Sequence, residues 1–472
     1  MSKVKIYPYP NSEGIPEELY IDINKPSHQG GEGKIYFTAD NRYTIKIHHS
    51  QSSNLNEKKI YLEQIVLLNK NLDSEAKNLF CWPISTVRSV DGNPSLGCVT
   101  RRIPQSYVKL IDLVFNARLA IRQFRDGHSW ANYLQIAKII ARSAEKLSFL
   151  GCTHTDFSFN NFLASIEPVD AILIDLDSLV VPGFWKPKVT GTPGFMAPEI
   201  TIDPTKNPPN EYSDRYALAI NILYTLLFRN PMKPLICHDP TSPENDEKIG
   251  WGKEAVFSEH PIDKRNHPAN LGKPLFYGGT LSYKMLTLPL QRLTEQAFID
   301  GLFKPERRPS ARAWINALSW AMDELWQCAN CKLHFPYPHW LKKSDRLCPF
   351  CGNHITQDVL SLLYLYEPRP EGQYAFTQRS LVMTKGWHLY SDILDPTRNP
   401  PISRKTEPKV GHIEWDDKRR INLLLNNDKN TWMARTNSSQ TTLNIHRGES
   451  IPLTPGTVIR FGDGQRLLVV AE

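Results

Sequence analysis

Four of the eight cysteines stand in two short knuckles, CANC and CPFC, and this feature constrains the chain more than any other. They are Cys328, Cys331, Cys348 and Cys351, and residues 332–347 separate the two pairs. Two C-x-x-C pairs at this separation supply the four thiolates that tetrahedral Zn²⁺ prefers, whereas four unrelated buried cysteines rarely fall into this pattern. A segment this short cannot build a hydrophobic core, so the metal would supply its folding energy. The spacing predicts a structural four-cysteine zinc ribbon over residues 323–356.

The composition is that of a globular chain with more than one domain. At 472 residues, 40% hydrophobic and 22% charged, the chain is too long for a single ordinary domain. The net charge of +7 is modest and comes without a long Lys/Arg block, so it is only weak support for a nucleic-acid or membrane surface. The apolar run at 216–228 is too short to span a bilayer, and the first residues lack the apolar segment of a signal peptide. The remaining cysteines are scattered singly, as expected in a reducing compartment (Cys81, Cys98, Cys152, Cys237). We therefore expect a cytoplasmic protein without a membrane partner.

Hydrophobic periodicity divides the chain into regions. Residues 1–50 have the pattern of short strands, and helical spacing follows at 55–71, 129–150, 214–228, 286–302 and 309–326, with an irregular stretch at 229–280. Strands first and helices later predict an α+β unit over 1–322, with a small sheet lobe and a larger helical lobe. The evenly spaced strands and turns of 360–472 predict a separate all-β sandwich.

A glycine-rich turn and two charged residues stand out near the start. In HQGGEGKIYFT, Gly30, Gly31 and Gly33 lie between two predicted strands, where backbone amides can approach a phosphate. The following segment is a strand, which argues against a dinucleotide fingerprint or a Walker loop; a plain hairpin is the alternative. Lys46 lies inside the next predicted strand, RYTIKIHH, and Glu57 stands in the first turns of the next helix. A solvated edge lysine and a surface glutamate favoured by the helix dipole are the alternatives for these two.

Polar residues also gather in one turn between a predicted helix and a predicted strand. CTHTDFSFNN contains Asp156 and Asn161 in the form H-x-D-x-x-x-x-N, and ILIDLDS carries Asp175 between apolar residues. A carboxylate at the end of a buried strand is costly unless it binds a positive group. GTPGFMAPE, SDRYALAI and PERRPSARAW follow in that order. Each fragment alone fits a turn or a surface helix, but their order and spacing together indicate a catalytic site.

Taken together, these motifs resemble a protein kinase domain over about the first 320 residues. The resemblance implies a bilobal fold and a site for ATP and Mg²⁺. It assigns the nucleotide site to Gly30, Gly31, Gly33, Ile35, Lys46 and Glu57, with Lys46 on the phosphates and Glu57 as its helix partner. It implies that Asp156 is the catalytic base toward a substrate hydroxyl and that Asn161 and Asp175 hold the metal.

The resemblance also implies contacts that support the site. Glu199 would form a buried ion pair with Arg308, and Asp214 would hold the backbone of the Asp156 turn. Thr192 occupies the position where serine/threonine kinases carry a threonine that contacts the catalytic aspartate.

Four positions depart from the kinase pattern. His28 replaces the first loop glycine, Thr155 replaces an arginine before the catalytic aspartate, and Ser158 replaces a lysine that helps to neutralise the transferred phosphate. Asp177 stands where the metal-binding triplet has glycine, either adding a metal oxygen or only occupying the turn. These departures keep a pseudokinase scaffold, which binds nucleotide and partner proteins, as the alternative function. A small-molecule kinase is a further alternative. The segment GTPGFMAPE argues against it, because the corresponding segment of protein kinases shapes the surface that binds the substrate peptide.

The combination of GGEGKIY, Trp82-Pro83, IDLDS and GTPGFMAPE is similar to bacterial serine/threonine kinases of TerY-type phosphorylation triads. This resemblance implies a protein substrate, a von Willebrand A-type protein and a metal-dependent protein phosphatase as partners. The tail faintly resembles a forkhead-associated sandwich, but Gly411 is followed by His412 and no phosphopeptide-binding residue carries over. Between the knuckles, KLHFPYPHWLKKSDR mixes basic and aromatic residues, so single-stranded nucleic acid is an alternative to protein contacts there.

Overall fold

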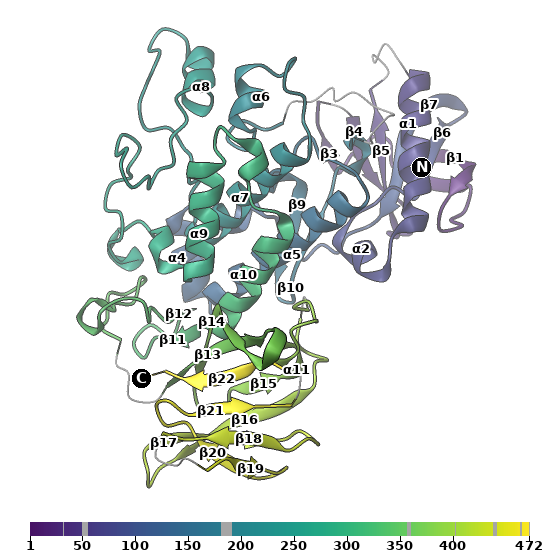
Figure 1. Ribbon diagram of the computed structural model, residues 1–472. Coiled ribbons are helices and arrows are strands. Elements are labelled where there is room, and N and C mark those ends of the chain that lie inside the picture. The colour runs from purple at the N-terminus through teal and green to yellow at the C-terminus, as the bar shows by residue number, and fades with distance from the viewer. Residues whose placement is uncertain are drawn as a thin grey trace. The chain divides into compact units, whose positions relative to one another are not determined.

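Figure 1 shows the computed structural model of the chain, which describes residues 1–31, 33–49, 55–180, 191–355, 360–401, 403–437, 441–462 and 465–471. The chain forms two compact units. The first comprises Met1–Ala120, Ile139–Asn266 and Asp300–Ala311, and the second comprises Ile121–Lys138, His267–Ile299 and Arg312–Glu472. Both units contain helices and strands, so the expected mixture of α and β structure is confirmed. The domain limits at 322, 356 and 360 stay a prediction.

A seven-stranded antiparallel sheet opens the first unit. Its strands are β1 (Ser2–Asn11), β2 (Glu18–Ile21), β3 (His28–Gln29), β4 (Gly33–Phe37), β5 (Tyr43–His48), β6 (Ser85–Val90) and β7 (Asn93–Arg101), in the order β2-β1-β6-β7-β5-β4-β3. Side chains alternate between the two faces of a strand, and one set, including Val4, Ile6, Ile45 and Val99, forms a common core. Strands β4 and β5 pair antiparallel, and in the turn between them Asn41 takes the left-handed conformation that asparagine tolerates.

Helix α1 (Leu55–Leu68) contacts β1, β6 and β7. Its buried residues Tyr61, Leu62, Ile65 and Val66 recur at helical spacing, which is the pattern that predicted the helix. A short 3₁₀ turn, Asn69–Asn71, continues it to the predicted end. Helix α2 (Ser74–Leu79) begins where the Asp73 side chain accepts the Ala76 N–H, a typical N-terminal cap.

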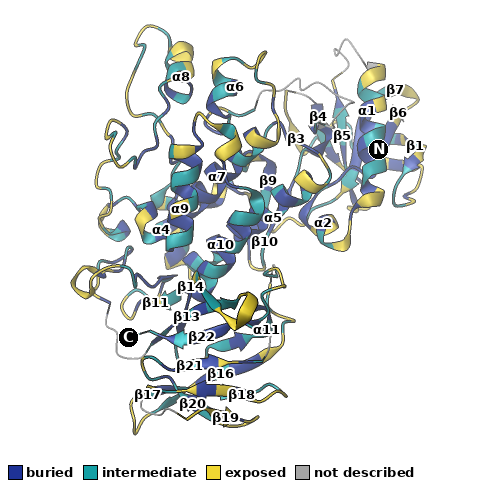
Figure 2. Ribbon diagram, viewed as in Figure 1, coloured by how far each residue is buried: buried dark blue, intermediate teal, exposed yellow. Residues whose placement is uncertain are grey.

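The remainder of the region up to residue 251 is mainly helical. Its elements are β8 (Val108–Lys109), α3 (Ile111–Val114), α4 (Ala117–Arg125), α5 (Trp130–Phe149), β9 (Phe162–Ile166), β10 (Val169–Leu173), α6 (Pro198–Ile202), α7 (Glu211–Leu227) and α8 (Pro243–Trp251). Helix α7 starts with a capping box, in which Asn210 and Ser213 satisfy each other's backbone N–H groups. It is buried along most of its length (Figure 2), so it forms the rigid centre of this region.

The second unit combines two further helices with the cysteine knuckles. Helices α9 (Leu288–Glu295) and α10 (Ala311–Asp323) lie within the predicted stretches at 286–302 and 309–326, and α9 continues as a π-helical turn, Gln296–Asp300. The short strands β11 (Leu325–Gln327) and β12 (His334–Pro336) pair antiparallel around the first knuckle.

The stretch expected to be irregular, 229–280, contains helix α8 of the first unit, whose N-terminal cap is Ser242.

The tail forms two antiparallel sheets around one core. One sheet has the order β14-β13-β22-β21-β18-β19 and the other β15-β16-β17-β20. The strands are β13 (Ser361–Pro368), β14 (Tyr374–Met383), β15 (His388–Tyr390), β16 (Lys409–Asp416), β17 (Ile421–Asn426), β18 (Trp432–Arg435), β19 (Leu443–Ile445), β20 (Ser450–Pro452), β21 (Val458–Arg460) and β22 (Leu467–Val470), with helix α11 (Ser391–Leu394) between β15 and β16. Trp432 and Leu424 lie fully buried between the sheets. A Cβ at Gly411 would lie 2.8 Å from the Trp432 ring, so packing explains this glycine.

Among the described residues, no helix is both long enough and apolar enough to cross a bilayer.

Candidate active site and metal centre

The turn that contains Asp156 is held by its own polar groups. Asn161 donates through Nδ2 to the Asp156 carbonyl at 2.8 Å and to Asp156 Oδ2 at 3.0 Å. The other carboxylate oxygen, Oδ1, accepts the Thr192 N–H at 2.9 Å. The predicted contact between Thr192 and Asp156 is confirmed, and it is made by the backbone amide. Asp156 therefore has a fixed orientation.

His154 braces the same turn. Its Nδ1 accepts the Asp156 N–H at 3.3 Å, and its Nε2 lies 3.2 Å from the Ile174 carbonyl oxygen. Because an amide N–H only donates and a carbonyl only accepts, the ring is neutral and carries its proton on Nε2. Burial lowers the pKa of His154, which favours this neutral form. The backbone of Ile174 also donates to the Asn161 carbonyl at 2.8 Å, so the Asp156 turn is tied to the residue before Asp175.

Helix α7 supports the turn through two polar side chains, the half-buried Asp214 and the buried Asn221. Asp214 Oδ2 accepts the His154 N–H at 2.9 Å, and Asn221 Nδ2 donates to the Phe157 carbonyl at 2.8 Å. The predicted role of Asp214 as a backbone anchor is thus confirmed as a contact. Burial raises the pKa of Asp214 well above its ordinary value.

Lys46 on β5 meets two carboxylates that follow β10. Its Nζ lies 2.6 Å from Asp175 Oδ1 and 3.0 Å from Asp177 Oδ1. Burial alone would lower the pKa of Lys46, but Asp177 and Asp175 raise it above its ordinary value. Burial and the neighbouring Asp177 raise the pKa of Asp175 to about 7. Asp175 itself takes the left-handed conformation, with φ of 62°, which is uncommon for a residue other than glycine and enriched at functional sites.

His48 extends this cluster toward helix α1. Its Nε2 lies 3.1 Å from Asp177 Oδ2, and its Nδ1 lies 3.1 Å from Lys58 Nζ. Burial alone would raise the pKa of Asp177, but Lys46 and His48 hold it well below its ordinary value. We refer to Lys46, His48, Asp175 and Asp177 as the Lys46 cluster.

The glycine-rich turn lies between β3 and β4. Gly30 and Gly31 are exposed, and Gly30 N–H donates to the Gly33 carbonyl at 3.0 Å. A Cβ at Gly33 would lie 2.3 Å from the Ile47 carbonyl oxygen, so the pairing of β4 with β5 requires glycine there. Ile35 is half-buried on β4, paired with Lys46. Glu57 is exposed in the first turn of α1.

Glu199 and Arg308 form the predicted ion pair. Arg308 Nη1 and Nη2 contact Glu199 Oε1 and Oε2 at 2.8 and 2.7 Å, a bidentate geometry. The Arg308 side chain is fully buried and also donates to the carbonyls of Gly301, Leu302 and Tyr212. This pair fixes the end of the segment that begins at Gly191 and that carries Thr192 to Asp156.

The four knuckle cysteines converge on one point. All four Sγ atoms lie within 4.8 Å of one another, with 3.7 Å between Cys328 and Cys351 and 3.6 Å between Cys331 and Cys348. Tetrahedral Zn–S bonds of about 2.3 Å would place the sulfurs about 3.8 Å apart. The donor set and spacing therefore fit a zinc ion, and four protein ligands would leave no open position.

Both knuckles use the same backbone turn. The residue after each second cysteine, Lys332 or Gly352, has positive φ, at 62° and 72°. Its N–H donates to the carbonyl of the first cysteine of its pair, at 3.0 Å from Lys332 to Cys328 and 2.8 Å from Gly352 to Cys348. A Cβ at Gly352 would lie 2.9 Å from Pro274, so glycine is also required by space.

Two members of the Lys46 cluster were not assigned from the sequence. The sequence leaves Asp177 open between a metal ligand and a turn residue, and the kinase motifs give His48 no role. A signal for His48 was present, because residues two apart on a strand share a face and His48 follows Lys46 at that spacing. No comparable signal identified Lys46 as the partner of Asp177.

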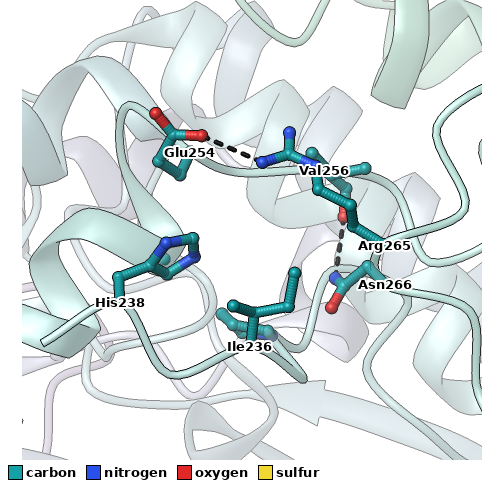
Figure 3. Close-up of a pocket in the computed structure, with 8 residues that line it drawn as sticks. Ile236, His238, Glu254, Val256, Arg265 and Asn266 are labelled. Atoms are coloured by element: carbon teal, nitrogen blue, oxygen red, sulfur yellow. Dashed lines mark hydrogen bonds and ion pairs between the residues drawn. The ribbon is translucent and has the colours of Figure 1, made fainter. Parts of the chain in front are cut away.

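A separate pocket lies in the segment from 234 to 266 (Figure 3). It is lined by Pro234, Ile236, His238, Gly250, Glu254, Val256, Arg265 and Asn266. Arg265 Nη1 contacts Glu254 Oε2 at 3.1 Å, and Asn266 donates to the Val256 carbonyl at 2.9 Å. None of the predicted site residues lines this pocket.

Comparison with known proteins gives one consistent signal. No protein-family model matches the chain. The protein kinase YegI of Escherichia coli O157:H7 is 24% identical over 398 residues, covering 80% of this chain and 55% of that protein. Protein kinase YegI of Escherichia coli strain K12 has the same identity and coverage. The chain thus spans about half the length of these curated relatives, and it is a distant homologue of a bacterial protein kinase.

Proposed function

We propose that the chain is an ATP-dependent serine/threonine protein kinase that transfers the γ-phosphate to protein hydroxyls. The observation that carries the proposal is the link between the Asp156 turn and the Lys46 cluster through Ile174, which His154 and Asn161 both contact. A carboxylate, an amide and a lysine–aspartate pair in one connected region supply the groups that phosphoryl transfer requires. The distant kinase homology supports the same activity.

Each residue would have a distinct part in the transfer. Asp156 would orient the substrate hydroxyl and accept its proton, and its fixed carboxylate suits that part. Lys46 would bind the nucleotide phosphates beneath the turn of Gly30, Gly31 and Gly33, with Ile35 against the nucleotide and Glu57 as a further partner of the lysine. Asn161 and Asp175 would hold Mg²⁺, which neutralises phosphate charge when bound.

The departures from the kinase pattern bear on rate. Thr155 and Ser158 are buried uncharged residues at positions where many kinases place cations. Without a cation at Ser158, less charge is available to neutralise the transferred phosphate, so we expect slow turnover. Because Thr155 replaces an arginine, the turn has no positive charge at this position, and there is less need for a phosphorylated segment to neutralise such a charge.

A pseudokinase scaffold is the second candidate. It is favoured by the engagement of Lys46 with two carboxylates and of both Asp156 oxygens with protein groups. Such a protein would bind nucleotide and partners without transfer.

The knuckles and the tail would serve docking. We infer a zinc ribbon of structural type at the four cysteines and an interaction module of forkhead-associated type in the tail, without phosphopeptide-binding residues. A von Willebrand A-type protein and a metal-dependent phosphatase are the partners that the triad resemblance implies, and a cytoplasmic location goes with them.

A phosphosite map tests the proposal. Purified chain is incubated with Mg-ATP, alone and with each partner, and phosphorylated residues are identified by mass spectrometry beside the Asp156→Ala variant. Serine or threonine phosphorylation that depends on Asp156 is expected. Nucleotide binding without any Asp156-dependent site would favour the scaffold.

A further inference from the structure

The Lys46 cluster contains two acidic residues that are not equivalent. Lys46 is 15% exposed at its side chain, Asp175 is 34% exposed and Asp177 is 3% exposed. A carboxylate buried to this extent is stable only when its charge is compensated by close donors. Asp177 meets this condition through Lys46, whereas Asp175 keeps a third of its surface open to a bound ion.

The two oxygens of Asp177 face different protein groups. Oδ1 lies 3.0 Å from Lys46 Nζ, and Oδ2 lies 3.1 Å from His48 Nε2. On the other side of the imidazole, Lys58 Nζ is a donor without acceptor capacity, so the His48 Nδ1 at 3.1 Å from it must accept. The His48 proton therefore lies on Nε2, which is the nitrogen nearer Asp177 but makes no hydrogen bond with Asp177 Oδ2. Hydrogen bonds join Lys58 to His48 and Lys46 to Asp177, and between these two pairs His48 Nε2 and Asp177 Oδ2 lie 3.1 Å apart.

We propose that Asp177 is the positioning residue for Lys46, through the contact between its Oδ1 and the ammonium group. This inference rests on the proposed function, because the position it sets is that of an ammonium group aimed at nucleotide phosphates. It replaces the two readings left open by the sequence: Asp177 is neither a metal ligand nor an idle turn residue.

If Asp177 positions Lys46, its substitution should weaken the binding of ligands that carry phosphates and leave the binding of a ligand without phosphates unchanged. Asp177→Asn keeps the shape of the side chain but removes one of the two carboxylate charges beside Lys46, the buried one, and leaves Asp175 in place. Losing one hydrogen bond to a charged group corresponds to about a tenfold loss of affinity. We expect ATP to bind about tenfold more weakly, while adenosine, which lacks phosphates, binds as in the wild type.

Binding of ATP and adenosine is measured by calorimetry on the full chain, in EDTA and in Mg²⁺. Asp170→Asn is the matched control, since Asp170 lies on β10 and accepts the Tyr107 hydroxyl at 2.6 Å outside the cluster. Glu57→Gln is compared in parallel, and we expect a smaller loss for ATP than with Asp177→Asn.

Each outcome decides. A loss for ATP in both EDTA and Mg²⁺, with adenosine unchanged, supports the positioning role. Three results would overturn the inference. A loss of ATP affinity only in Mg²⁺ would make Asp177 a metal ligand, and an equal loss for adenosine would make its role merely structural. Unchanged or tighter ATP binding would show that Asp177 does not position Lys46. If wild-type chain transfers phosphate in an Asp156-dependent way, such a result leaves the proposed function standing. If wild-type chain binds no ATP, both fall.

Discussion

The cysteine centre and the Lys46 cluster each bring four side chains into one small space, but the chain assembles them differently. The cysteines come from one stretch of the chain, 328–351, and two copies of one backbone turn present them. Asp175 and Asp177 lie 129 and 131 residues from Lys46 and reach it only when β5 and the end of β10 are brought together. A site built from one short stretch of the chain can therefore be predicted from the spacing of its residues. At a site built from distant stretches, the partners of Lys46 depend on which acidic residues the fold brings next to it.

Loss of a knuckle ligand should give the largest effect, if the local site carries its own folding energy. Cys348→Ser removes a buried ligand, and structural zinc sites contribute about 10 kcal/mol or more of apparent binding free energy at neutral pH. We expect zinc content, measured by atomic emission, to fall from near one ion per chain to near none, with an early unfolding transition. Cys237→Ser is the control, because Cys237 is an exposed single thiol. Equal zinc in both variants would show that the four cysteines are not the site.

Breaking the Glu199–Arg308 pair should damage the assembled region and spare the local one. Arg308→Met leaves Glu199 without its bidentate partner, and removing one member of a buried pair costs about 4 kcal/mol. We expect urea unfolding to show this loss while zinc content stays that of wild type. The double variant with Glu199→Gln should recover part of the stability. A double variant no more stable than Arg308→Met would mean that the carboxylate is not what the arginine compensates.

A buried charge cluster in the second unit allows a pH test of smaller size. Asp323 contacts Arg379 at 2.6 Å and also Arg404, which contacts Asp392 at 2.8 Å. Burial alone would raise the pKa of Asp323, but Arg404 and Arg379 hold it below its ordinary value of 3.8. Because the folded pKa is the lower one, the carboxylate contributes stability above pH 3.8, and this contribution is lost as the pH falls through the folded pKa.

We therefore expect Asp323→Asn to lower stability by about 3 kcal/mol at neutral pH. The difference from wild type should shrink as the pH falls below 3.8, while zinc loss at low pH affects both proteins alike. Thermal unfolding of the two proteins across this range measures it. A difference that stays constant with pH would mean that the charge of Asp323 has no part in the effect.

The same contrast between local and distant contacts explains which features of the fold and of the site could be predicted from the sequence. Strands and helices with clear periodicity, such as β5 and α7, lie where expected, because burial of one face decides both pattern and structure. The Glu199–Arg308, Asp214–His154 and Thr192–Asp156 contacts were foreseen through the kinase resemblance.

What the sequence did not settle is the choice among similar groups. The kinase pattern offers Asp175 and Glu57 as acids near Lys46, and Asp177 stands where that pattern has glycine. Only the three-dimensional path of the chain shows Asp177 buried against Lys46 with Glu57 exposed. Thr192 similarly contacts Asp156 through its amide, which every residue except proline offers. The kinase resemblance therefore predicted that Thr192 contacts Asp156, but it did not indicate that the backbone amide makes the contact.

The central claim is that Asp156 takes part in phosphoryl transfer at the site it shares with the Lys46 cluster. Single-turnover transfer from Mg-ATP to protein, measured for wild type and Asp156→Ala at equal nucleotide occupancy, tests it most directly. Loss of a general base is expected to slow transfer about a thousandfold, with the melting temperature little changed. Equal rates for the two proteins would contradict the claim.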